Sequence, residues 1–294
     1  MKPFLLFLLS AFVLAEASAA GKPVVQATNY PLFYFAQRIG GDRIDLQFLA
    51  PADGDPAFWE PSDADIAKLQ RADRILTNGA TYEKWLDHVS VPDDLLVATS
   101  AAFAGHYIEI KDSTTHSHGK AGAHSHSGTA FTTWIDFDQG RQQAESVLAA
   151  LLELLPAATL DLETSAKVLF AEIDQLDRDA AAVAKAIGNT PLVASHPVYH
   201  YLGRRYGLTI QAVLWEPEVV PDDASMKTLS DLLAKHPAKW MIWEGEPAAE
   251  SVGKLDAIGL KSVVFDPCGN RPENGDWLSV MRSNVANLKS ITTP

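Results

Sequence analysis

Residues 161–187 read DLETSAKVLFAEIDQLDRDAAAVAKAI and show a regular apolar repeat. The apolar side chains recur every three or four residues, which places them on one face of an α-helix. These positions are Leu162, Ala166, Leu169, Ile173, Leu176, Ala180, Val183 and Ile187. Gly188 and Pro191 end the helix, because glycine readily forms a left-handed cap and proline cannot continue a helix. At about 1.5 Å per residue the helix is about 40 Å long, enough to cross a domain.

The spacing has two explanations. A coiled-coil partner would account for it, but a single isolated stretch more commonly packs on its own domain. The opposite helix face carries charged side chains that we expect to face water: Glu163, Lys167, Asp174, Asp177, Arg178 and Lys185. We therefore predict a stiff helix that lies on its own chain and joins the units on either side.

Short apolar runs alternate with helical patterns on both sides of this helix, which is typical of parallel sheets covered by helices. The predicted strands are residues 24–28, 44–50, 74–77, 95–98, 191–194, 208–214, 240–243 and 262–265. The other predicted helices are residues 31–39, 65–71, 139–155, 199–206, 226–235, 251–258 and 278–288. The prediction is an α/β fold of two lobes, each a parallel sheet flanked by helices, joined by one long backbone helix. The N-terminal lobe is expected at 21–138, connecting helices at 139–188 and the C-terminal lobe at 189–294.

The N-terminus has the pattern of a secretory leader. Lys2 precedes an apolar run, and small residues follow around Ala17–Ala20, as at a signal-peptide cleavage site. The run is too short for a membrane-spanning helix, so residues 1–20 are predicted to be a signal peptide and the protein to be periplasmic, not embedded in a membrane. The single cysteine, Cys268, excludes an intrachain disulfide. The net charge of −13 argues against nucleic acid as a partner.

Polar side chains follow the strands of the second half. His196, Glu216, Glu244 and Asp266 each stand just beyond a predicted strand. Ligands of parallel sheets bind beyond these carboxyl ends. His196 and Asp266 are the strongest candidates for a mixed nitrogen and oxygen zinc site. The alternative is that His196 only caps the next helix and Asp266 only its own turn.

Residues 112–129 read DSTTHSHGKAGAHSHSGT and show no apolar period, so a mobile loop is expected. Two pairs of histidines lie within it: His116, His118, His124 and His126. Neutral imidazoles on flexible backbone are suited to metal capture. A solvated linker is the alternative.

Four tryptophans allow a binding pocket larger than a metal site. Trp59, Trp134, Trp215 and Trp243 fall in segments predicted at strand ends or facing a cleft. They are either core filling or the wall of a pocket for something larger than an ion. The sequence carries no nucleophile elbow, phosphate-binding loop or HExxH motif, and we predict no enzyme activity.

Several segments together resemble the zinc/manganese-type periplasmic binding proteins that serve ABC transporters. They are TNYPLFYFAQRIGGD, PSDADIAKLQRADRILTNGATYEKWLDHV, the long helix, SHPVYHYLGRRYGL and VVFDPCG, in the family's order and with its histidine-rich loop. The resemblance implies two α/β lobes, a metal held in the cleft between them, small closure motions and an ABC permease as partner. It also implies His196 and the carboxylate of Asp266 as two of four metal ligands.

The other two ligands of the family are missing here. The resemblance places histidines where this chain has Ala57, after Asp55-Pro56, and Thr132, two residues before Trp134. The loop histidines, Glu60 or Glu216 are the candidate replacements. Trp59, Thr132 and Trp134 are further candidates for the cleft.

The leading hypothesis is a monomeric periplasmic solute-binding protein that captures a divalent metal, zinc or else Mn²⁺ or another ion, and delivers it to an ABC permease. One alternative keeps the transport role but changes the cargo to a metal chelate or a small organic ligand in an aromatic cleft. Another is a periplasmic metal chaperone or buffer that docks to other proteins.

Overall fold

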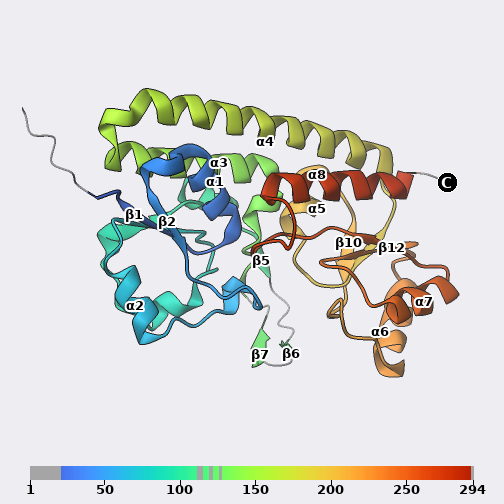
Figure 1. Cartoon of the computed structure of the whole chain (residues 1–294). Coiled ribbons are helices and arrows are strands. Elements are labelled where there is room, and N and C mark those ends of the chain that lie inside the picture. The colour runs from blue at the N-terminus through green and yellow to red at the C-terminus, as the bar shows by residue number, and fades with distance from the viewer. Residues whose placement is uncertain (1–20, 111–114, 119–121, 126–127, 293–294) are drawn as a thin grey trace, which may run out of the picture.

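Two four-stranded parallel sheets lie beneath the long helix α4 in the computed structural model (Figure 1). The structure describes residues 21–110, 115–118, 122–125 and 128–292. The first sheet has the order β2-β1-β3-β4 and the second β10-β9-β11-β12. The strands of the first are β1 (Val24–Ala27), β2 (Asp45–Phe48), β3 (Arg74–Thr77) and β4 (Leu96–Ala98), and those of the second are β9 (Leu192–Ala194), β10 (Ile210–Ala212), β11 (Trp240–Trp243) and β12 (Lys261–Val264). We call the two halves the first and the second lobe.

The long helix α4 runs from Thr159 to Ile187, two residues longer at its start than the spacing predicts. All eight apolar positions of the predicted face are buried, and Gly188 ends the helix with φ 61°. This face packs on α1 (Tyr30–Gly40), α3 (Phe137–Leu154) and α8 (Trp277–Leu288). The helix therefore packs on its own chain, and its heptads need no coiled-coil partner.

The remaining helices are shorter and flank the sheets. They are α2 (Asp63–Leu69), α5 (His200–Tyr206), α6 (Asp223–Leu233) and α7 (Ala249–Ala257). Their ends differ from the predicted ranges by a few residues, as helix ends commonly do. Among the described residues, no helix is both long and apolar enough to cross a bilayer.

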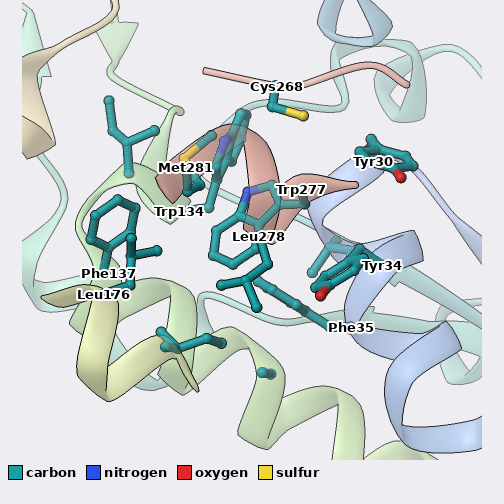
Figure 2. Packing of buried hydrophobic residues seen from close by; sticks show 14 of the residues in the cluster. Tyr30, Tyr34, Phe35, Trp134, Phe137, Leu176, Cys268, Trp277, Leu278 and Met281 are labelled. Carbon is teal, nitrogen blue, oxygen red and sulfur yellow. The ribbon is translucent and has the colours of Figure 1, made fainter. Parts of the chain in front are cut away.

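Helix α8 connects the two lobes through its first residue. The ring of Trp277 is fully buried, with its centroid 5.0 Å from that of Phe35 and 6.3 Å from that of Phe137 (Figure 2). Phe35 belongs to α1 of the first lobe, although α8 follows the second sheet in the chain. One apolar core thus runs through both lobes and under α4. The division of the chain at residues 138 and 188 stays a prediction.

Part of the histidine-rich segment has regular backbone where a loop without structure is expected. Strands β6 (Thr115–His118) and β7 (Gly122–Ser125) pair antiparallel, with His116 opposite His124. Strands β5 (Glu109–Ile110) and β8 (Gly128–Thr129) pair at the base of the segment. His126 and the side chains of the other three histidines lie outside the described residues, so the predicted metal capture and mobility of the segment stay predictions.

Candidate metal centre

Three side chains of the second lobe bring potential metal-binding atoms together. One atom each of His196, Glu216 and Glu244 lie within 4.8 Å of one another. The Nδ1 atom of His196 is 3.5 Å from Oε1 of Glu244 and 3.8 Å from Oε1 of Glu216. A single cation placed among these atoms would gain one imidazole and two carboxylate ligands, a mixed nitrogen and oxygen set that zinc accepts.

The order of the second sheet explains this convergence. His196 follows the inner strand β9, and the neighbours of β9 are β10 and β11, which precede Glu216 and Glu244. Backbone hydrogen bonds continue beyond the strands, from Ser195 N to Ile242 O at 2.8 Å and from Trp215 N to Ser195 O at 2.8 Å. They hold the three strand ends side by side, so the side chains that follow meet over the edge of the sheet.

The cluster opens into a cavity of about 510 Å³ between the lobes. Asp266, which follows β12, lines the same cavity, and its Oδ1 accepts a hydrogen bond from Cys268 N at 2.6 Å. Across the cavity, Asp55 of the first lobe accepts a hydrogen bond from Ala57 N at 2.9 Å. Asn270 ties the two sides together, since its amide donates to the carbonyl oxygens of Pro51 and Gly54 at 2.8 and 2.6 Å.

The electrostatics of the cavity favour a cation. Burial, together with the neighbouring charges of Glu218 and Asp55, raises the pKa of Glu216 to about 7. Burial, and next the charge of Glu216, raises the pKa of Glu244 well above its usual range. Burial also raises the pKa of Asp266. Asp55 keeps solvent contact at the cavity mouth, but protein atoms crowd its carboxylate, and this desolvation raises its pKa.

Burial is the cause that these four shifts share, and neighbouring carboxylates add to it for Glu216 and Glu244. Buried carboxylates resist ionisation unless a positive charge compensates them. No Lys or Arg is among the described residues that line this cavity. A bound divalent cation would supply the missing charge and reverse the local pKa shifts.

The residues singled out by the sequence fall into two groups. His196, Asp266, Glu216, Thr132 and Trp134 all line the cavity. Trp134 is buried and its indole Nε1 donates to the carbonyl oxygen of Pro267 at 2.7 Å. Their roles as metal or cleft residues stay predictions, but the fold does bring them together.

Other predicted members lie elsewhere. Trp59 packs against Trp85 with ring centroids 5.8 Å apart, and Glu60 is exposed, so neither lines the cavity. Trp215 and Trp243 pack on each other in the core of the second lobe. Of the two readings of these tryptophans, core filling therefore applies to Trp59, Trp215 and Trp243, and only Trp134 lines the cavity.

Two acidic residues of the cavity, Glu244 and Asp55, were not among the metal ligands predicted from the sequence. Glu244 directly follows β11, and its strand-end position was a usable signal. Asp55 precedes Pro56, and Ala57, which takes the place of a family histidine, is fully buried and does not line the cavity. The Asp-Pro pair marks this position in the family resemblance, but it points to residue 57 and not to Asp55 as a ligand.

Comparison with known proteins identifies the family. A family model described as the periplasmic component A of the zinc-uptake complex, ZnuA, matches residues 25–291. The chain belongs to this family. The ZnuA family consists of metal-binding components of transport systems that act outside the cytoplasm, and its members are not enzymes. The resemblance seen in the sequence and the predicted α/β fold of two lobes are thus confirmed.

Relatives within and near the ZnuA family are distant in sequence. The chain is 25% identical to the zinc-binding protein AdcA of Streptococcus pyogenes serotype M3, over 94% of this chain and 57% of the relative. It therefore spans little more than half the length of these streptococcal proteins. It is also 25% identical to the high-affinity zinc uptake system protein ZnuA of Bacillus subtilis, over 92% of this chain and 88% of the relative.

Solved structures show the same fold. The metal-dependent lipoprotein YcdH from Bacillus subtilis superposes with a TM-score of 0.77 at 22% identity, covering 92% of this chain and 98% of that one. The Zn(II)-bound ZnuA-like domain of AdcA from Streptococcus pneumoniae gives a TM-score of 0.76 at 21% identity, covering 92% and 99%. At these identities the likeness concerns the fold alone.

Proposed function

We propose that this protein captures a divalent metal ion, foremost zinc, in the cavity between its lobes and delivers it to an ABC permease. One observation carries the proposal: an imidazole and two carboxylates converge within 4.8 Å at the wall of an acidic cavity. Family membership and the zinc-binding names of the relatives support the choice of metal.

The ligand set differs from that of the family resemblance. Glu216 and Glu244 supply the donors that Ala57 and Thr132 cannot, and both stand on the second lobe beside His196. Asp266 and Asp55 lie on the same cavity and contribute further oxygen atoms when the lobes close on the ion. A set with one nitrogen and several oxygens binds zinc but also suits harder ions such as Mn²⁺, which prefer oxygen.

The proposed cell compartment and partners follow from the family and the leader. Residues 1–20 act as a signal peptide, so the protein works in the periplasm. It acts there as a monomer and meets the permease at the membrane surface. The family's place in zinc-uptake complexes supports this setting. The net charge of −13 argues against nucleic acid as a partner of this protein.

Calorimetric titration of the purified, metal-free protein with zinc tests the cargo. We expect one high-affinity site, which Glu244→Gln weakens by at least about tenfold because the amide carries no charge for the ion. Glu250→Gln is the matched control, since Glu250 lies on α7 with its side chain 69% exposed. A wild-type protein that binds zinc no more tightly than micromolar, or no better than Glu244→Gln, would contradict the proposal.

A further inference from the structure

The cavity has two chemically different sides. The converging group of His196, Glu216 and Glu244 lies on the second lobe, whereas aromatic rings line much of the first-lobe side. The ring of Tyr82 has its centroid 5.3 Å from that of Phe131 and 5.8 Å from that of Trp134, and Phe58 lies 6.3 Å from Phe131. All four residues line the cavity. We call them the aromatic wall; apart from the phenol oxygen of Tyr82, their side chains carry no atom that commonly binds zinc.

The buried hydroxyl group of Tyr82 suggests that a molecule bound in the cavity carries a hydrogen-bond acceptor. Tyr82 is 1% exposed, and its oxygen has no hydrogen-bond partner among the described residues. Burial raises its pKa well above the usual range, so the hydroxyl stays protonated and can donate. A buried donor without an acceptor costs free energy, and an acceptor atom on a bound molecule would remove that cost.

The segment directly before Tyr82 has a strained backbone. Gly79, Ala80 and Thr81 have φ values of 77°, 50° and 62°, and a positive φ is unfavourable for a β-branched residue such as Thr81. The buried carboxylate of Glu83 anchors this turn by accepting hydrogen bonds from Asn78 N at 2.6 Å and Gly79 N at 3.1 Å. Strain of this kind persists where surrounding contacts enforce it, commonly at binding sites.

Gly269 lines the cavity next to Tyr82 and Trp134. A Cβ atom added at Gly269 would lie 3.9 Å from the hydroxyl oxygen of Tyr82 and 3.5 Å from the ring of Trp134, which is ordinary van der Waals contact. A side chain at this position would therefore cover part of the aromatic wall.

The size and charge of the cavity narrow the class of ligand. Six waters around a hydrated ion occupy about 180 Å³, at about 30 Å³ each. The cavity measures about 510 Å³, within the range of about 300–1,000 Å³ typical of small-molecule sites. Asp55, Glu216, Glu244 and Asp266 would repel an anionic chelator such as citrate. A flat ring without negative charge suits the aromatic wall.

We propose that the cargo binds as a complex of the metal ion with a small nitrogen-donor chelator that has an aromatic ring and, before it binds the ion, no net negative charge. The inference rests on the proposed function, because the metal still binds His196, Glu216 and Glu244. The chelator completes the coordination that these three side chains leave open, and its ring packs on the aromatic wall. Where the chelator carries an acceptor oxygen, the Tyr82 hydroxyl donates to it.

Native mass spectrometry combined with zinc titration at buffered free zinc tests this inference. The probes are L-histidine, which carries an acceptor carboxylate, and 2,2′-bipyridine, which carries none; citrate is the anionic control. We expect ternary complexes of protein, zinc and either nitrogen chelator, with zinc held at least tenfold more tightly than alone, and none with citrate.

Two variants assign the contacts. Tyr82→Phe should weaken the complex with L-histidine by about tenfold, the effect of one hydrogen bond, and leave zinc alone and the bipyridine complex unchanged. Tyr206→Phe is its control, because that hydroxyl donates to Asp177 outside the cavity. Gly269→Ala should weaken both ternary complexes by narrowing the space.

The outcomes separate the two proposals. If zinc binds equally well with and without either nitrogen chelator and no ternary species forms, the chelate inference is overturned while the proposed function stands. If no zinc is retained under any of these conditions, the proposed function itself fails. Tighter binding with citrate than with either nitrogen chelator would also overturn the inference.

Discussion

At the scale of single residues, metal binding is linked to the protonation of the side chains that line the cavity. Glu216 and Glu244 are carboxylates in a place where burial disfavours their charge. His196 is 3% exposed and lies between them. Metal ligands must be deprotonated, so binding must displace protons from this cluster.

The pKa of Glu216, raised to about 7, sets the direction of a pH dependence. Below pH 7 its carboxyl is mostly protonated in the metal-free protein, and zinc must displace that proton. Zinc affinity should therefore fall as pH falls below 7, by up to about tenfold per pH unit for each proton released. Calorimetric titrations between pH 5.5 and 7.5 measure this slope.

The Glu216→Gln variant should show weaker binding and a shallower slope, because one titrating group is removed. Glu250→Gln, on the surface, should follow the wild type. An affinity that stays constant across this pH range would show that Glu216 is already ionised or takes no part in binding.

At the scale of elements, helix α4 holds the two lobes by its buried face. Leu169 is fully buried on that face, and the adjacent Val168 is 54% exposed on the other. Leu169→Ala should lower the free energy of unfolding by about 2–5 kcal/mol, through lost burial and the cavity left behind. Val168→Ala should change it by less than about 0.5 kcal/mol. Urea denaturation followed by circular dichroism compares the two variants, and equal effects would contradict the assigned faces.

The histidine-rich segment is an element that can be removed. Strands β5 and β8 pair at its base, with Ile110 opposite Gly128, so a short glycine linker can replace residues 111–127. His196, Glu216 and Glu244 lie outside the segment, and we expect the tight zinc site to keep its affinity within about threefold while any weaker sites disappear. Zinc titration of both proteins measures affinity and stoichiometry. Loss of the tight site would show that the loop histidines supply ligands to it.

At the scale of the whole molecule, the continuous core predicts cooperative unfolding. Buried residues of both lobes, of α4 and of α8 form one apolar cluster. Scanning calorimetry should therefore show a single transition rather than one for each lobe. Zinc at one hundred times its dissociation constant should stabilise the fold by about 2.7 kcal/mol and raise the midpoint temperature. The Glu244→Gln variant should lose most of this rise, and two separate transitions would contradict a shared core.

Much of the architecture could be predicted because its signals are local. The buried face of α4 follows from a repeat of three and four residues, and strands β3 and β11 lie where their apolar runs predict. His196, Glu216 and Glu244 could be recognised as strand-end residues. Trp59 and Glu60 could not be placed, because the direction of a loop side chain depends on packing with distant segments such as the one around Trp85.

The two α/β lobes, the long helix and the polar residues at the strand ends follow from the sequence alone, since periodicity and strand ends are properties of neighbouring residues. Which strand-end residues meet depends on the packing of the folded chain. In the order β10-β9-β11-β12, the strand before His196 has β10 and β11 as neighbours, which bring Glu216 and Glu244 beside the imidazole. Asp266 follows β12, one strand further away at a spacing of about 4.8 Å per strand. Strand order comes from long-range pairing, and no local pattern encodes it.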